Sequence, residues 1–137
     1  AGSGRSGRLA MRVALDTSRY VDFCKGLPEA LDVVQRADRI LVPLMVLAEL
    51  RGGFLVGSRG PENEQLLTRF LSSPRVRVLS PDEETTHHYA RLFRQLRTQG
   101  TPIPVNDLWI AALVSQHRLW LYARDRHFDH LPQLARL

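Results

Sequence analysis

The amino-acid sequence predicts an α/β fold with one parallel sheet of four to five strands, flanked by helices as in a Rossmann-type three-layer sandwich. Three observations lead to this prediction. Short β-prone apolar runs alternate with helical stretches along the whole chain, a pattern typical of parallel sheets. The length of 137 residues suits one domain. A hydrophobic fraction of 44% is enough for a core without disulfides.

Four apolar runs are predicted to be strands. They are bounded by polar residues, proline or helix-start signals, as expected of buried strands. The runs are 12–15, 39–42, 76–79 and 120–123. Pro43 is expected to end the second run, and the tail from Pro132 is expected to add a fifth strand at an edge of the sheet.

The stretches between these runs carry helix start and stop signals. Thr17 and Ser18 begin a short helix, and Pro28 opens another that runs to about Arg36. Longer helices are expected over 43–56, 62–71, 80–98 and 107–117, and a loop or short helical turn over 124–131. Asn106 is expected to cap the last long helix, and Gly100 to end the one before it.

Residues 1–10 are rich in Gly, Ser and Arg, and Met11 follows them. We interpret this stretch as a leader added for protein expression, which leaves a single domain over 11–137. It has no apolar segment typical of secretory signals, and no run approaches the roughly 18 apolar residues of a membrane helix. Cys24 is the only cysteine, so no internal disulfide is possible, and a reducing cytoplasm is the expected compartment.

The chain is basic, with a formal net charge of +5, and Lys25 is its only lysine. Arginine grips phosphate in a bidentate fork, so this composition suits a polyanionic partner. A bias of genome composition toward arginine explains it equally well. The positions of the acidic residues are therefore more informative than the net charge.

Four acidic residues are expected near one edge of the sheet. Asp16 directly follows the first strand and Asp125 comes just after the fourth, and ligands of open α/β sheets bind outside the carboxyl ends of the strands. Asp107 begins the helix that leads to the fourth strand. Glu49 lies one to two turns into the helix after the second. These carboxylates are therefore expected to converge.

Each acid also has a structural explanation. Asp16, Asp107 and Asp125 lie near helix starts, and for each one taken alone capping is the better explanation. Glu49 interrupts a very apolar stretch, where an ionised carboxylate is costly unless it is paired or bound to metal. The solvated edge of an amphipathic helix explains Glu49 equally well. Together, however, four converging carboxylates repel one another unless something neutralises them.

A hard divalent cation is the simplest neutralising partner. Mg²⁺ or Mn²⁺ prefers oxygen ligands and lowers the pKa of a bound water, which suits phosphodiester hydrolysis. Arginines are the alternative partners, and four are near these acids in the sequence: Arg19, Arg51, Arg124 and Arg126. Zinc is disfavoured, because His127-x-x-His130 has no accompanying cysteine and His87 and His88 face different ways on a helix.

Four segments resemble the motifs of PIN-domain ribonucleases, and specifically of VapC-type toxins from bacterial toxin–antitoxin pairs. The resemblance covers residues 11–137. The segments are 13–18 (VALDTS), 47–51 (LAELR), 103–112 (IPVNDLWIAA) and 123–129 (ARDRHFD). They contain the four acids in the order and at the distances of the family.

The resemblance implies a Mg²⁺- or Mn²⁺-dependent endoribonuclease, the toxin of a type II module. Its metal-binding and catalytic quartet would be Asp16, Glu49, Asp107 and Asp125. Asp16 and Asp107 would be direct ligands, and the other two acids would act through water or a second ion. Ser18 would support the site. Metal-activated water would cleave RNA.

Protein partners are also implied. A VapB-like antitoxin would inhibit the enzyme by covering the acidic pocket with its C-terminal segment. A homodimer is expected, and Trp109 with the apolar helices could supply its interface.

Two positions depart from the family pattern. Arg19 stands where the family more often has an aliphatic residue, and it could hold substrate phosphate or weaken the metal site. Ala123 replaces the usual Thr or Ser of the closing motif. Both motivate an alternative, a catalytically weak PIN-fold module that binds RNA or a protein. A DNA nuclease of this fold is a third possibility, and Asp129 is a further acid with an expected structural role.

Overall fold

A four-stranded parallel sheet forms the centre of the described part of the protein, residues 10–137 of the computed structural model. The strands are β1 (Arg12–Leu15), β2 (Arg39–Pro43), β3 (Val76–Leu79) and β4 (Trp120–Tyr122), in the order β3-β2-β1-β4. The predicted α/β fold is confirmed. The expected leader over 1–10 lies, apart from Ala10, outside the described residues.

The strands differ from the prediction only at their ends. β2 includes Pro43, which pairs with Leu79 of β3. Since β2 pairs with β1 only as far as Leu41, no strand on that side needs an N–H from this proline. The expected fifth strand is reduced to one bridge, in which Leu121 donates to the Ala135 carbonyl at 2.8 Å and accepts from Leu137 at 3.0 Å.

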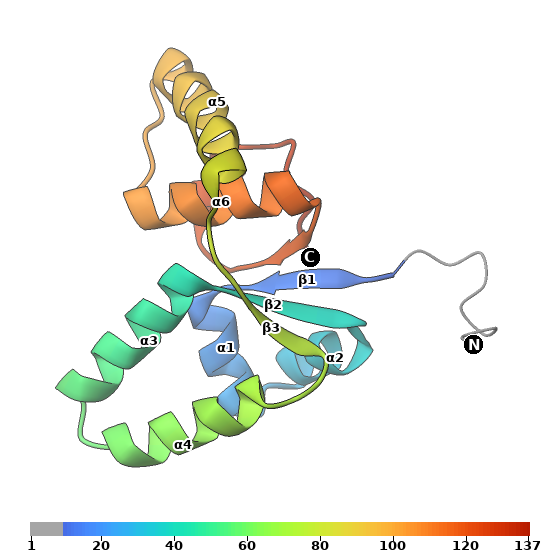
Figure 1. Ribbon diagram of the computed structural model, residues 1–137, viewed down its shortest axis with the longest axis vertical. Helices are drawn as coiled ribbons and strands as arrows, with labels where there is room; N and C mark the ends of the chain where they lie inside the picture. Colours follow the sequence, from blue (N-terminus) through green and yellow to red (C-terminus); the bar gives the residue numbers. More distant parts are fainter. Residues whose placement is uncertain (1–9) are drawn as a thin grey trace.

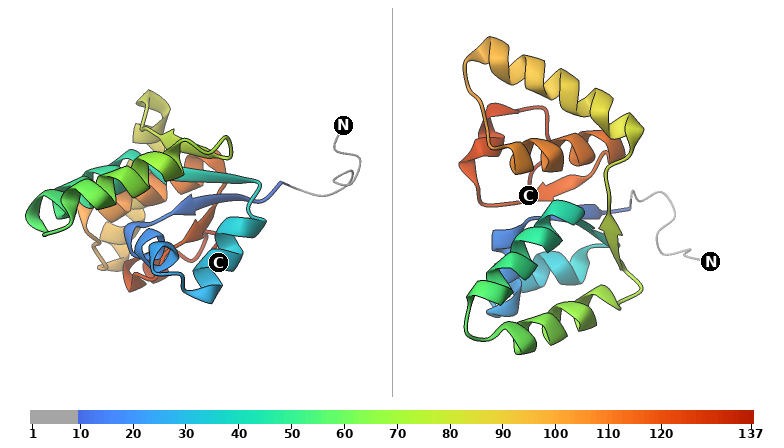
Figure 2. Two further views of the ribbon diagram at one scale, coloured as in Figure 1. Left: turned by 90° about the horizontal axis from the view of Figure 1, so that it is seen from below. Right: turned by 60° about the vertical axis from the view of Figure 1, so that its left-hand side comes forward.

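Helices cover both faces of the sheet, as Figures 1 and 2 show. One face carries α5 (Glu83–Gln99) and α6 (Val105–His117); the other carries α1 (Thr17–Cys24), α2 (Pro28–Arg36) and α4 (Gly60–Leu71). α3 (Leu44–Val56) leads from β2 to α4, and a short 3-10 helix, η2 (Arg126–His130), follows β4. The predicted three-layer arrangement is therefore present.

The start of α6 differs from the prediction. The Leu108 N–H donates to the Pro104 carbonyl at 3.0 Å, so the helix begins at Val105 and Asn106 lies in its first turn. The predicted Asn106 cap is wrong, because the fixed φ of Pro104 already suits the entry into a helix. Gly100 ends α5 as predicted, in the left-handed conformation with φ 72°.

α6 is the most buried helix and carries Asp107 in its first turn. Six of its residues are buried: Leu108, Ile110, Ala111, Ala112, Leu113 and Val114. Such all-round burial is expected of a helix that lies between a sheet and a second helix. No helix within residues 10–137 is both long enough and apolar enough to cross a membrane.

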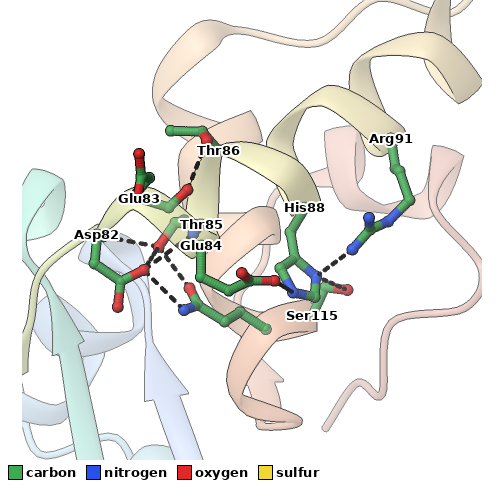
Figure 3. Close-up of polar contacts among 9 residues, drawn as sticks. Asp82, Glu83, Glu84, Thr85, Thr86, His88, Arg91 and Ser115 are labelled. Carbon is green, nitrogen blue, oxygen red and sulfur yellow. Dashed lines mark hydrogen bonds and ion pairs between the residues drawn. The ribbon is translucent and has the colours of Figure 1, made fainter.

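A polar junction, drawn in Figure 3, fixes the start of α5 against α6. Asp82 caps α5: its Oδ1 accepts the Thr85 N–H at 3.0 Å, and its own N–H donates to Thr85 Oγ1 at 2.9 Å. Gln116 of α6 donates to the same Asp82 oxygen at 3.0 Å. On the neighbouring turn, His88 Nδ1 lies 3.4 Å from Ser115 Oγ. These bonds hold α6 in place, and with it Asp107.

Removal of the Thr85 hydroxyl should destabilise the protein. Thr85 is fully buried, and Thr85→Val keeps its shape but leaves its hydrogen-bonding partners unpaired. We expect the free energy of unfolding in urea to fall by about 1–3 kcal/mol. Thr86→Val, on the exposed side of the same turn, is the matched control and should change it by less than about 0.5 kcal/mol. Equal effects of the two variants would contradict the assignment.

Candidate functional site

The candidate site lies at the carboxyl edge of the sheet, where the strand order reverses. β1 pairs with β2 on one side and with β4 on the other, an arrangement that opens a crevice between β1 and β4. Asp16 directly follows β1, and Asp125 lies three residues after β4. Asp107 comes from the first turn of α6 and Glu49 from the second turn of α3. This edge lies on the left of Figure 1, where α1, α3 and α6 begin.

The structure brings these four carboxylates close enough to affect one another. Asp16 is 7% exposed, and burial is the largest cause that raises its pKa to about 6. The negative charges of Asp107, Glu49 and Asp125 raise it further. The Thr17 N–H, which donates to Asp16, opposes the rise. The quartet therefore shares one electrostatic environment.

Asp107 and His127 form a second coupled pair. Burial raises the pKa of Asp107, the hydrogen bond from His127 lowers it, and the charge of Asp125 raises it again. The same hydrogen bond with Asp107 is the main cause that raises the pKa of His127. The imidazole therefore tends to stay protonated beside these acids.

Two residues supply the hydrogen bonds that hold the quartet. Thr17 donates its N–H to Asp16 Oδ1 and its hydroxyl to Glu49 Oε1, each at 2.8 Å. His127 donates its backbone N–H to Asp125 Oδ1 at 2.9 Å. Its ring Nδ1 lies 2.7 Å from Asp107 Oδ2 and 2.8 Å from Asp125 Oδ1. Because an ionised carboxylate only accepts, we assign a proton to Nδ1.

One oxygen of each carboxylate is left free of these donors. Within residues 10–137, no hydrogen bond reaches Asp16 Oδ2, Glu49 Oε2, Asp107 Oδ1 or Asp125 Oδ2. A hard divalent cation prefers carboxylate oxygens as ligands. Each of these acids has one oxygen held by a hydrogen bond and a second oxygen that could bind such a cation. Ligand atoms of Asp107, Asp125 and His127 lie within 4.8 Å of one another, whereas Asp16 and Glu49 do not belong to this close cluster. The residues present therefore fit Mg²⁺ or Mn²⁺.

Arginines do not neutralise the quartet in the described part of the chain. Arg19 and Arg124 both pair with Asp22, at 3.2 and 3.1 Å, and Arg51 pairs with Glu64 at 3.0 Å. The Arg19 guanidinium also stacks 4.5 Å from the centre of the Tyr122 ring. The Arg19 guanidinium is therefore occupied by Asp22 and Tyr122, and no ion pair joins it to the four acids within residues 10–137.

The contacts of His127 with two of the acids were not predicted, because the sequence suggested His127 only as half of a disfavoured zinc pair with His130. His130 is exposed, and only its backbone carbonyl is used, by Gln99 at 3.0 Å. The spacing of Asp125 and His127 was the available signal, since an N-cap aspartate bonds to the N–H two residues on. The contacts of Thr17 with Asp16 and Glu49 were not predicted either. Ser18 was expected to support the site, but the Ser18 hydroxyl bonds to no described residue.

Comparisons with known proteins agree with the observed fold. The sequence profile of the PIN domain family matches residues 13–134. Ribonuclease VapC5 of Mycobacterium tuberculosis is 32% identical over 121 residues, 88% of each chain. The structure of VapBC-5 from M. tuberculosis, a member of the VapBC family of toxin–antitoxin systems, superposes with a TM-score of 0.68 at 32% identity over 90% of this chain and 93% of that one. The structure of VapBC-1 from nontypeable Haemophilus influenzae superposes with a TM-score of 0.80 at 28% identity. The match covers 93% of this chain and 97% of that one.

The raised pKa of Asp16 predicts a stability that falls as pH rises. The group titrates near 3.9 when unfolded and at about 6 in the fold, so its stabilising proton is present below pH ~4 and lost through pH ~6. Asp16→Asn keeps the helix cap and removes the charge. In EDTA at pH 7 it should raise the free energy of unfolding by up to about 3 kcal/mol. The gain should shrink toward zero at pH 4, and a gain that is equal at both pH values would contradict the pKa assignment.

Proposed function

The chain belongs to the PIN-domain family, with VapC ribonucleases as its relatives, and from that premise we propose that it is a divalent-metal-dependent endoribonuclease, the toxin of a toxin–antitoxin pair. The quartet of Asp16, Glu49, Asp107 and Asp125 is the observation that carries the proposal. The other three acids lie near enough to Asp16 to raise its pKa, at the edge of the sheet where ligands of α/β folds bind. RNA is the substrate, and the cytoplasm is the proposed compartment.

We assign Mg²⁺ or Mn²⁺ to the quartet. A bound ion of this kind lowers the pKa of water and offsets the charge that develops on a phosphodiester during hydrolysis. Asp16 and Asp107 are the most buried of the four acids, with Asp107 only 16% exposed at its side chain. They are the proposed direct ligands. Asp125, 41% exposed, and Glu49 would act through water or hold a second ion.

Hydrolysis also needs a proton acceptor. As the water oxygen forms its bond to phosphorus and the bond to the leaving oxygen breaks, the water loses a proton and the leaving oxygen gains one. Glu49 is the most exposed member of the quartet, and its Oε2 has no described hydrogen-bond partner while Thr17 anchors Oε1. We therefore assign the role of general base to Glu49.

A VapB-like antitoxin and a second copy of the chain are the proposed protein partners. The relative VapBC-5 belongs to a family of toxin–antitoxin systems, which supports the antitoxin. For the homodimer, α5 and α6 expose Phe93 (47%) and Val105 (60%). They lie on the same helix pair as Trp109, which packs on Tyr89 with ring centres 4.4 Å apart. We assign this apolar surface to the second copy.

Loss of either proposed direct ligand should abolish RNA cleavage without unfolding the protein. Loss of an outer partner of a metal ligand typically costs about 10- to 100-fold, so loss of the ligand itself should cost at least about 100-fold. Asp16→Asn and Asp107→Asn are therefore compared with native protein on a single-stranded RNA in Mg²⁺, with circular dichroism as the fold check. Asp129→Asn is the control, because Asp129 pairs with Arg136 at 3.1 Å instead. A matched DNA strand, which lacks only the 2′-hydroxyls, should stay intact.

Metal removal separates this proposal from the alternative of a binding module. EDTA should stop cleavage, and millimolar Mn²⁺ should restore it and raise the melting temperature of the native protein by mass action. Asp16→Asn should lose most of that thermal shift. A melting temperature that does not change on addition of Mn²⁺, together with an RNA affinity that falls as the salt concentration rises, would favour the non-catalytic module.

A further inference from the structure

We propose that His127 is a positioning residue of the metal site, which holds Asp107 and Asp125 side by side through the N–H of its ring Nδ1. The inference rests on the proposed function and adds to the four acids a residue that contacts two of them. Its effect would be to turn the remaining oxygen of each acid toward a common ligand.

The contacts come from two separate elements. Asp107 belongs to α6, and Asp125 caps η2. His127 contacts both acids. Its ring Nδ1 forms a hydrogen bond with Asp107 Oδ2 at 2.7 Å and an ion pair with Asp125 Oδ1 at 2.8 Å, and its backbone N–H donates to the same Asp125 oxygen at 2.9 Å. No other described side chain bridges these two acids. The imidazole therefore ties the helix to the loop after β4 at the site itself.

Electrostatics explains why such a bridge is needed. The charge of Asp125 raises the pKa of Asp107, which means that the two carboxylates repel each other when both are ionised. A shared donor offsets this repulsion and fixes both side-chain rotamers before a cation arrives. Partners that orient metal ligands in this way typically contribute about 10- to 100-fold to metal affinity.

The same geometry argues against direct ligation by Nδ1. That nitrogen already faces two acceptors at hydrogen-bonding distance, so a cation would have to displace its proton. Nε2 has no described hydrogen-bond partner, and the His127 side chain is 43% exposed. This nitrogen lies on the opposite side of the imidazole ring from Nδ1, which contacts the two acids. Positioning through Nδ1–H is therefore the role that the contacts support.

The chain offers a set of variants that isolates the Nδ1 donor. His127→Asn places an amide nitrogen close to the position of Nδ1, His127→Gln places it nearer to that of Nε2, and His127→Leu removes the donor at similar size. His130→Leu is the matched control, since the His130 ring lies in the same 3-10 helix and bonds to no described residue. Mn²⁺ affinity is measured without RNA, by the electron paramagnetic resonance signal of free Mn²⁺, so the readout does not depend on cleavage.

We expect His127→Leu to weaken Mn²⁺ binding by about 10- to 100-fold, His127→Asn to restore most of it, and His130→Leu to leave it unchanged. Melting in EDTA checks that the variants fold. If the Leu variant does not fold, tighter Mn²⁺ binding by Asn than by Gln still supports the assignment. Unchanged or tighter binding by folded His127→Leu would overturn it, as would Asn and Gln variants that bind alike.

Two further outcomes are distinguishable. Pulsed electron paramagnetic resonance of bound Mn²⁺ should show no strong imidazole-nitrogen coupling; such a coupling in the native protein, lost in His127→Asn and in His127→Gln, would overturn positioning in favour of direct ligation. Native protein that neither binds Mn²⁺ nor cleaves RNA would overturn the proposed function and this assignment together. Native protein that does both, while folded His127→Leu does so equally well, would overturn this assignment alone.

Discussion

Mutual repulsion among four carboxylates at one edge of the sheet is the constraint that organises this protein. Asp16 is nearly buried, and the three neighbouring acids raise its pKa in addition to the effect of burial. The fold withstands this repulsion by anchoring one oxygen of every acid to a donor. Thr17 anchors Asp16 and Glu49, and His127 anchors Asp107 and Asp125. The second oxygen of each acid accepts no hydrogen bond from residues 10–137.

Backbone hydrogen bonds and helix caps both fix the positions of these acids. The Asp16 N–H donates to the Tyr122 carbonyl at 3.2 Å, which ties the end of β1 to the end of β4. Asp16 caps α1 and Asp125 caps η2, so the structural explanation of these aspartates holds alongside the functional one. Capping uses one carboxylate oxygen and leaves the other available. Asp107 differs, because Pro104 occupies the N-cap position of α6, and its Oδ2 is held by His127 instead.

Much of this could be predicted from the sequence, and the remainder could not for physical reasons. Strands and helices are specified by local patterns, so the prediction missed their ends by only a few residues, as at Pro43 and Asn106. The position of Asp16 and Asp125 at one edge was predictable because acids that follow parallel strands share that edge, whereas Asp107 and Glu49 reach it from the first turn of α6 and the second turn of α3. The bond from His127 to Asp107 joins residues 20 positions apart and depends on how η2 packs on α6. Periodicity does not reveal such a contact.

Two buried aspartates of the same region differ in how the fold compensates their charge. Asp22 is 4% exposed and Asp16 is 7% exposed, so both lose most of their hydration. Asp22 receives two arginines, Arg19 and Arg124, which compensate its charge as buried carboxylates require. Asp16 receives only a backbone N–H and lies among three further acids. Arginines are abundant in this chain, but none pairs with Asp16 in the described residues, and burial together with the three acids raises the pKa of Asp16 to about 6. A divalent cation bound at this edge of the sheet, as proposed above, would compensate the charge of Asp16 as the two arginines compensate that of Asp22.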